Sequence, residues 1–231
     1  MNECRSAAVT ENFCKLFEDG ILYRENRLVN WCVYLNTTLS NLEVVQKTLP
    51  GRTLMNVPGY PPNERIEFGV IVSFVYPVVG SDEKIVVATT RPETILGDTA
   101  VAVHPDDERY KHLHGKMLQH PFIPERQVPL VTDSIAVDMA FGTGAVKITP
   151  AHDPNDYDVG KRHNLPFINI LNDDGTLNAN AGEFQGMKRF SARRAVVEAL
   201  KAKGLYVETK DNPMVVPVCE RSGDCLLYTS D

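Results

Sequence analysis

Two short segments hold most of the side chains that could do chemistry, and the first is residues 88–98, ATTRPETILGD. Its hydroxyl groups could orient a small polar ligand or a water, and Arg91 could hold a phosphate or a carboxylate with two parallel hydrogen bonds. Pro92 and Gly97 keep the backbone out of regular structure, so these side chains are expected at an open end of a sheet. A capped turn with a structural pair of Arg91 and Glu93 is an equally good interpretation. The hydroxyls are those of Thr89, Thr90 and Thr94.

The second segment is residues 142–158, GTGAVKITPAHDPNDYD. A strand through its first half would bring Lys147 and Thr149 to one face, because they are two residues apart. A helix then begins, with Asp153 as its N-cap and Asp156 in its first turn. The helix dipole and the free backbone amides favour carboxylates there, so both are expected to stay ionised at neutral pH. A capping role alone accounts for Asp153, but it accounts less well for the whole group.

Other patterns are interpreted as structural. Gly142 and Gly144 precede a strand and do not open a helix, so they are not a phosphate-binding fingerprint. The sequence also lacks a Gly-x-Ser-x-Gly nucleophile elbow. His152 is kept with the acidic group that it adjoins. The histidines interpreted as structural are His104, His112, His114, His120 and His163.

The composition indicates a globular chain. Its 231 residues are 43% apolar, enough for one sizeable core, and no apolar run reaches the roughly 18 residues that span a bilayer. The polar N-terminus leads into no secretory stretch, so a cytoplasmic protein without a membrane partner is expected. A net charge of −6 argues against a general nucleic-acid coat. The locally basic residues 188–203 are interpreted as a solvated helix face.

The cysteines favour reduced thiols. They are odd in number and scattered, without a CxxC pair, so neither a disulfide framework nor a zinc site is expected. The five are Cys4, Cys14, Cys32, Cys219 and Cys225.

The order of elements predicts an α+β fold with a β-rich body. Residues 66–79 and 84–89 are expected to form a hairpin, and helices are expected from Asp153 and over residues 191–203. Short strands of irregular spacing with few helices suggest a closed or partly closed barrel with peripheral helices. The further strands are expected at residues 100–103, 128–132, 145–149 and 167–171.

The outer parts of the chain differ from this body. Residues 6–18 have helical spacing, residues 27–34 read as a buried strand, and the prolines and glycines of residues 50–64 mark a linker. Extended apolar runs return after residue 205, so the first 50 and the last 20 residues are interpreted as two sides of a stalk. Residues 225–231 resemble a translated sequencing adaptor and are set aside as a non-native tail.

Taken together, these segments resemble the editing domain of valyl-tRNA synthetases. The motifs that carry the resemblance are TTRPET at 89–94, GTGAVK at 142–147 and AHDPNDY at 151–157. Lys147 and the run His152-Asp153-Pro154 point to the valyl branch, because isoleucyl and leucyl enzymes share only the threonine-rich strand and the final aspartate. The resemblance covers roughly residues 7–224. Residues 27–31 and 212–217 are similar to the two strands that tether the domain.

The resemblance implies a β-barrel-rich editing domain with peripheral helices, inserted through a two-stranded stalk from a Rossmann-type class I synthetase core. The expected divisions are a core remnant with the outgoing stalk at 1–50, the editing domain at 51–208, the return stalk at 209–224 and the tail at 225–231. The HIGH and KMSKS signatures of the ATP site are absent. ATP, magnesium and the attachment of valine to tRNA(Val) are therefore implied for the parent enzyme alone, and Met1 is expected to be an internal methionine of a truncated reading frame.

The implied activity is hydrolysis of a mischarged amino acid. A pocket shaped for valine rejects the nearly isosteric threonine only about 100-fold, the usual illustration of this limit. A second site must therefore hydrolyse threonyl-tRNA(Val), or threonyl-adenylate, and leave valine attached. The implied partners are the 3′ acceptor end of tRNA(Val), threonine and the catalytic core of the parent chain. Neither a metal nor another cofactor is implied for editing.

Roles for single residues follow from the resemblance. Asp156 would bind the α-ammonium of the substrate, and Asp153 and Lys147 would read the threonine hydroxyl. Arg91 and Thr94 would hold the terminal adenosine, and a water oriented by hydroxyls would attack the ester. The expected catalytic residues are Lys147, Asp153, Asp156 and Thr94. The expected substrate-binding residues are Thr89, Thr90, Arg91, Glu93, Thr149 and His152.

Two alternatives stay open beside this activity. The chain could be a tRNA-binding appendage without catalytic competence, or an unrelated barrel hydrolase or structural domain. One departure from the family concerns zinc. Some bacterial members carry two cysteine pairs, whereas here only Cys32 and Cys219 remain, and the positions of their partners hold Leu35 and Ser222. Two thiolates do not close a zinc site, so none is implied.

Overall fold

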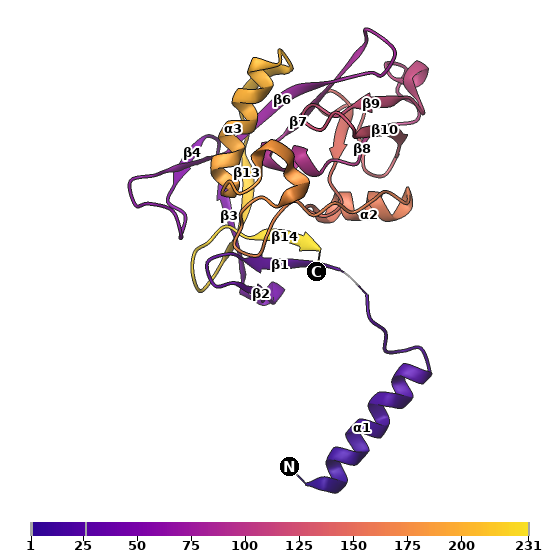
Figure 1. Ribbon diagram of the computed structural model, residues 1–231, viewed down its shortest axis with the longest axis vertical. Coiled ribbons are helices and arrows are strands. Elements are labelled where there is room, and N and C mark those ends of the chain that lie inside the picture. The colour runs from indigo at the N-terminus through magenta and orange to yellow at the C-terminus, as the bar shows by residue number, and fades with distance from the viewer. Residues whose placement is uncertain (1, 26, 231) are drawn as a thin grey trace.

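The computed structural model describes residues 2–25 and 27–230, and it confirms an α+β fold with few helices (Figure 1). The α-helices are α1 (Glu3–Glu18), α2 (Pro154–Arg162) and α3 (Arg189–Ala202). The short 3₁₀ helices are η1 (Asn41–Glu43), η2 (Pro92–Gly97), η3 (Lys111–Leu113) and η4 (Ala179–Phe184). Within the described ranges, every helix is too short or too polar to cross a bilayer.

Two sheets form the body. The first has the order β12–β6–β7, with β6 (Val70–Pro77) antiparallel to both β7 (Lys84–Thr89) and β12 (Tyr206–Asp211). The second has the order β11–β8–β10–β9, in which only β8 and β10 are parallel. Its strands are β8 (Ala100–Val103), β9 (Met117–Gln119), β10 (Gln127–Thr132) and β11 (Ala145–Ile148). The hairpin of β6 and β7 confirms the expected one.

The expected barrel is not closed. One isolated bridge between Val78 and Leu118 joins the two sheets on one side. On the other side β7 lies beside β11, but residues 2–25 and 27–230 contain no ladder between them. β7 ends at Thr89, and Pro92, which has no backbone N–H to donate, opens η2 three residues later. The side chains at the ends of β7 and β11 therefore surround an opening.

The main core lies between the two sheets and α3. Phe74, Tyr76 and Ile85 from the first sheet pack with residues of the second sheet and with the apolar face of α3. That face repeats every four residues, at Ala192, Val196 and Leu200, which are fully buried. The helix predicted at 191–203 is confirmed and begins two residues earlier.

Smaller pairs of strands surround this body. The ribbon of β3 (Val44–Leu49) and β13 (Met214–Cys219) is antiparallel, and β1 (Leu28–Cys32) lies between β2 (Thr37–Leu39) and β14 (Leu227–Ser230). In contrast, α1 extends away from the body and buries none of its residues (Figure 1).

Three expectations for local structure need correction. Residues 50–64 are not a bare linker, because β4 (Thr53–Met55) pairs with β5 (Ile66–Phe68). Residues 167–171 form no strand and contribute only an isolated bridge from Leu171 to Leu177. Residues 225–231, which were set aside, contribute β14, where Leu227 is buried. Their origin as an adaptor stays a prediction.

Candidate active site

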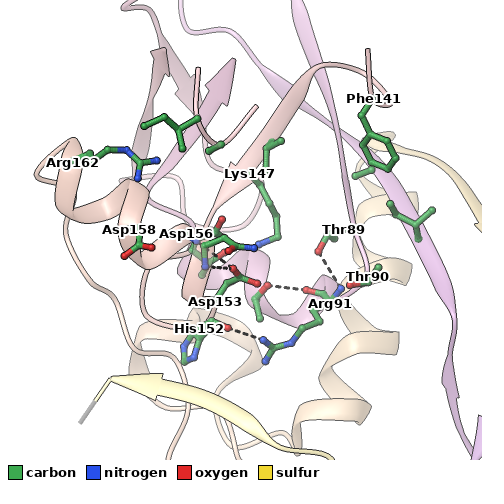
Figure 2. A pocket seen from close by; sticks show the side chains of 18 residues that line it. Thr89, Thr90, Arg91, Phe141, Lys147, His152, Asp153, Asp156, Asp158 and Arg162 are labelled. Atoms are coloured by element: carbon green, nitrogen blue, oxygen red, sulfur yellow. Dashed lines mark hydrogen bonds between the residues drawn. The ribbon is translucent and has the colours of Figure 1, made fainter. Parts of the chain in front are cut away.

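A cavity of about 710 Å³ opens where β7 and β11 end (Figure 2). Its walls come from the turn after β7, from β11, from the N-terminal end of α2 and from the loop before β11. Nine of the ten predicted site residues line it, and Glu93 does not. The nine are Thr89, Thr90, Arg91, Thr94, Lys147, Thr149, His152, Asp153 and Asp156.

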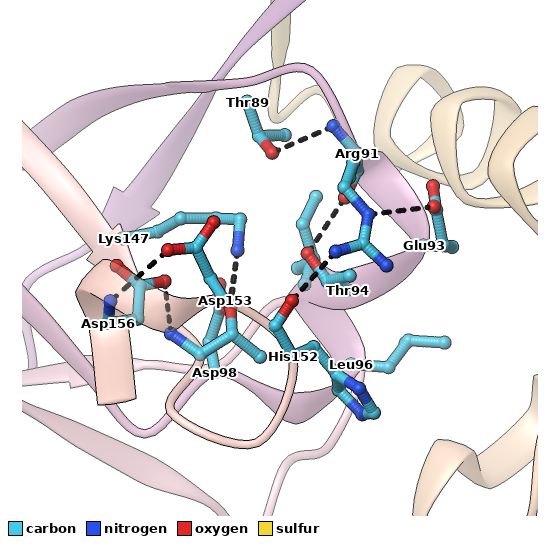
Figure 3. Close-up of polar contacts among 12 residues, drawn as sticks. Thr89, Arg91, Glu93, Thr94, Leu96, Asp98, Lys147, His152, Asp153 and Asp156 are labelled. Atoms are coloured by element: carbon cyan, nitrogen blue, oxygen red, sulfur yellow. Dashed lines mark hydrogen bonds and ion pairs between the residues drawn. The ribbon is translucent and has the colours of Figure 1, made fainter. Parts of the chain in front are cut away.

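Lys147 is held by a buried network at one wall of this cavity (Figure 3). Its ammonium donates to Asp98 Oδ1 at 3.0 Å and also to the hydroxyl of Thr149. Thr149 donates in turn to the same Asp98 oxygen at 2.5 Å, and Tyr76 donates to the other at 2.6 Å. These hydrogen bonds join four side chains from three segments of the chain and so fix the position of the Lys147 ammonium.

Asp98 is the residue of this network that sequence reasoning missed. Its side chain is fully buried, and burial raises its pKa, although the charge of Lys147 and the hydrogen bonds from Thr149 and Tyr76 oppose this. Burial also raises the pKa of Tyr76, so its hydroxyl stays a donor. The signal in the sequence was Lys147 itself, because a lysine on a strand between apolar residues needs an anionic partner if it is buried.

Two carboxylates lie at the start of α2. Asp153 caps the helix and accepts from the amides of Asn155 and Asp156 at 2.9 and 3.2 Å. Asp156 accepts from the amide of Thr149 at 2.8 Å, which joins α2 to the end of β11. Burial raises the pKa of Asp156 to about 7, and Asp153 adds to the rise while Lys147 opposes it. The expectation that Asp156 is fully ionised at neutral pH is therefore wrong.

Arg91 is fixed by the protein on two sides. Its Nη1 donates to the carbonyl of His152 at 2.7 Å, and its Nε lies 3.6 Å from Glu93 (Figure 3). Its backbone shapes the turn, because its amide donates to Thr89 at 3.1 Å and its carbonyl accepts from Thr94 at 2.9 Å. The two threonine hydroxyls therefore support the turn that presents Arg91.

Glu93 points away from the cavity and toward α3. Both of its oxygens accept from Arg193, at 2.7 Å each, and the side chain is almost fully buried. Burial alone would raise the pKa of Glu93, but the adjacent Arg193 lowers it to about 2. The suggested Arg91–Glu93 pair therefore exists, as part of a larger buried cluster.

The basic residues 188–203 are not simply a solvated face. Arg189 is 2% exposed and donates to buried Asp224 at 2.8 Å. Arg193 likewise lies inward, with Glu93. The interpretation as a solvated face fails for these two residues and fits Arg194 and Lys201, whose side chains are about half exposed.

His152 has no free ring nitrogen. Its Nε2 accepts from the amide of Ile170 at 3.0 Å, so its Nδ1 carries the proton that is donated to the carbonyl of Tyr228 at 3.0 Å. Burial lowers its pKa to about 3. The imidazole is therefore neutral and braces the cavity wall, and it is unsuited to proton transfer.

The loop before β11 adds an aromatic residue at the cavity mouth that sequence reasoning also missed. Phe141 lines the cavity and is 74% exposed (Figure 2). The loop is anchored by Arg109, which donates to the carbonyl of Met139 at 2.9 Å. Gly144, with φ +70°, lets this guanidinium approach, because a Cβ there would meet it at 2.3 Å. In the sequence Phe141 stands between Ala140 and Gly142, where nothing marks it as exposed.

Metal ligands do not gather in the described ranges, where no three His, Cys, Asp or Glu side chains form a group that could hold an ion. Cys32 and Cys219 are both buried, and the Sγ of Cys32 lies 3.3 Å from the hydroxyl of Ser222. The cavity lining thus offers the fixed ammonium of Lys147, two guanidinium groups, three carboxylates and several hydroxyls. Such a set suits a ligand with an ammonium, a hydroxyl and a phosphate or ribose.

Comparison with known proteins places the chain in a family. Residues 1–211 match the sequence model described as tRNA synthetases class I (I, L, M and V). The mitochondrial valine–tRNA ligase of Saccharomyces cerevisiae is 65% identical over 95% of the chain, and the valine–tRNA ligase of Schizosaccharomyces pombe is 65% identical over 98%. The human valine–tRNA ligase is 59% identical over 95%. These stretches are 20%, 23% and 17% of the relatives, so the chain spans about a fifth of their length.

Solved structures give a weaker likeness. The crystal structure of GlLeuRS-CP1 has a TM-score of 0.48 and 13% identity, and it covers 62% of this chain and all of that one. A ternary complex of Agrobacterium radiobacter K84 LeuRS with tRNA and LeuAMS has a TM-score of 0.45 and 18% identity, over 95% of this chain and 32% of that one. The sequence match over residues 1–211 carries the assignment: the chain belongs to the class I tRNA synthetases of the isoleucine, leucine, methionine and valine group.

Proposed function

We propose that this chain is the editing domain of a valine–tRNA ligase and that its cavity hydrolyses threonyl-tRNA(Val). The observation that carries the proposal is that Lys147 and Asp156 line one cavity and are each hydrogen-bonded to Thr149. A threonyl ester carries a cationic ammonium and a side-chain hydroxyl, which supply one partner for each of these two groups. The high identity to valine–tRNA ligases supports the valine system.

The α-ammonium of the substrate would bind at Asp156. The ionised carboxylate is required for this contact, and a bound cation favours ionisation, so substrate binding lowers the raised pKa of Asp156. Asp153 lies in the same helix turn and adds negative potential. Both carboxylates would keep their backbone hydrogen bonds when the ammonium binds, so the protein would need little reorganisation.

The threonine hydroxyl would be read by Lys147 together with Asp153. The ammonium of Lys147 is held by Asp98 and Thr149, so it is oriented before the substrate arrives. Valine carries a methyl group in place of the hydroxyl and would leave this buried charge partly unsolvated. Polar sites reject analogues that lack the matching group strongly, which is the discrimination an editing site needs.

The terminal adenosine would lie toward the mouth of the cavity. Arg91 and Thr94 line the cavity in fixed orientations, and Phe141 offers an exposed ring on which a base can stack. A water would attack the ester carbonyl, oriented by threonine hydroxyls and by oxygens of the substrate. We propose that editing uses no metal or other cofactor, which predicts full activity in the presence of EDTA.

The test is single-turnover deacylation of threonyl-tRNA(Val) by the 231-residue chain. Asp156→Asn is expected to lower the rate about 10- to 100-fold, since hydrogen bonds to charged groups contribute about 1.5–3 kcal/mol. Asp82→Asn, an exposed carboxylate in the turn between β6 and β7 that does not line the cavity, is the matched control. An unchanged rate in Asp156→Asn would remove the ammonium site from the proposal. Acceptor-end binding without any deacylation by the wild-type chain would favour the alternative of a binding module.

A further inference from the structure

A second cavity, of about 560 Å³, lies behind the turn that forms one wall of the first. Its walls come from β5, β6, β12 and α3. Thr90 lines both cavities, so the two openings meet at the turn between β7 and η2. Nothing in the proposed hydrolysis uses this second cavity.

Positive side chains dominate its lining. The lining holds five cationic side chains and only two anionic ones, Glu67 and Glu198. The local charge is therefore positive, although the net charge of the chain is −6. The five cations are Arg52, Arg65, Arg193, Arg194 and Lys201.

Most of these cations are available to a stronger anion. Arg52 lies 2.7 Å from Glu67 and 3.1 Å from Asp211, and Lys201 lies 2.8 Å from Glu198, in pairs whose side chains are at least 42% exposed. Such exposed pairs contribute about 0–1 kcal/mol, so a phosphate can displace the carboxylate. Arg65 is exposed, and in the described ranges it makes no ion pair. Arginine holds phosphate oxygens in a bidentate way.

Aromatic rings interleave with these charges. Phe190 and Tyr206 both line the cavity, and the Nζ of Lys201 lies 5.3 Å from the centre of the Tyr206 ring. Grooves for single-stranded nucleic acids combine a positive track for the backbone with aromatic rings beside it.

We propose that the second cavity holds the sugar–phosphate backbone of the unpaired nucleotides that precede the terminal adenosine of the tRNA. The inference rests on the proposed function, which places the aminoacylated end in the first cavity. The strand must then leave over one rim. At the Thr90 rim it meets the cations of the second cavity. At the opposite rim it meets the exposed Asp158, and Arg162 there is already paired with buried Asp133 at 2.8 Å.

The experiment measures the hydrolysis of two substrates by each member of one series of variants. The variants are Arg65→Glu, Arg194→Glu and the double variant, and the substrates are threonyl-tRNA(Val) and 3′-O-threonyl-adenosine, which lacks the preceding nucleotides. Each reversal is expected to lower the ratio of kcat/KM for the tRNA to that for the adenosine ester by about tenfold at low salt. Each should also reduce the slope of log kcat/KM for the tRNA against log salt concentration by about 0.7.

Lys111→Glu is the matched control, because Lys111 is exposed, pairs with Glu108 and lines neither cavity. An unchanged substrate ratio in the double variant, with an unchanged salt slope, overturns the inference. If the wild-type chain hydrolyses neither substrate, the proposed function fails, and the groove is then tested by fluorescence titration with an oligonucleotide ending in CCA. Equal affinity of the wild-type chain and the double variant for that oligonucleotide would show that the second cavity does not bind these nucleotides.

Discussion

Lys147 and Asp98 form a buried ion pair, in which the ammonium lies 3.0 Å from the carboxylate and neither side chain is more than 9% exposed. The pair joins the strand of one reactive segment to the end of the other, 49 residues away in the chain. Such a pair contributes less to net stability than its Coulomb energy suggests, because both charges lose water. Its contribution is to hold one positive charge at a fixed point of the cavity.

Asp98→Asn is expected to impair discrimination as well as stability. Losing one partner of a buried pair costs about 3–5 kcal/mol, and Lys147 would lose its fixed orientation. Tyr76→Phe is milder, because it removes one hydrogen bond to Asp98, about 1 kcal/mol, and keeps the ring. The measurement is the ratio of deacylation rates for threonyl- and valyl-tRNA(Val). If Tyr76→Phe lowers both rates by the same factor, the network is structural only.

Deacylation is expected to rise with pH through the ionisation of Asp156. With a pKa of about 7, this carboxyl is neutral below that pH and can pair with an ammonium only above it. The kcat/KM should therefore increase from about pH 6 to about pH 8, because this parameter reports groups of the free enzyme. Carboxyl NMR titration checks the assignment, with Asp156→Asn to identify the signal. A carboxyl that titrates near pH 4 would contradict the expectation.

Glu93 and Arg193 are expected to make the fold sensitive to acid. The pKa of Glu93 is lowered from 4.5 to about 2, so its contribution to stability is present above pH 4.5 and is lost as the pH falls toward 2. Glu93→Gln should unfold at lower denaturant concentration at pH 7 and lose less stability on acidification than the wild-type chain. Urea titrations at several pH values measure both effects. Arg194→Ala, from an exposed pair with Glu64, should change stability by less than about 1 kcal/mol.

Phe141→Ala is expected to weaken substrate binding without destabilising the fold. Stacking of a base on an aromatic ring contributes about 1–3 kcal/mol, which corresponds to a KM increase of about 5- to 150-fold. The ring is 74% exposed, so the melting temperature should stay the same. Ile135→Ala removes another exposed apolar side chain at the same cavity and is the matched control. Equal KM values for the two variants would show that the ring does not stack.

The sequence was a good guide where local rules decide the structure. The cap at Asp153 followed by Pro154, and the strands at 100–103 and 145–149, follow from capping and from apolar runs. The structure confirms them, with the second strand ending one residue earlier, at Ile148. The grouping of nine site residues at one cavity was predicted from the family resemblance. Neither required knowledge of distant contacts.

What the sequence did not reveal depends on contacts between distant segments. Asp98 matters because Tyr76 and Lys147 converge on it, and its own neighbours in the chain do not show this. Glu93 was predicted as a substrate-binding residue, but its side chain pairs with Arg193 of α3, 100 positions away in the chain. The raised pKa of Asp156 likewise comes from burial between α2 and β11, whereas capping rules alone predict the opposite direction.

The pairing of β3 with β13 bears on how the body connects to other parts of a protein. Leu49 and Met214 are direct partners in this ladder, so the backbone enters and leaves residues 50–213 at points one strand spacing apart, about 5 Å. Two ends this close let a segment be joined to another domain with little rearrangement of that domain.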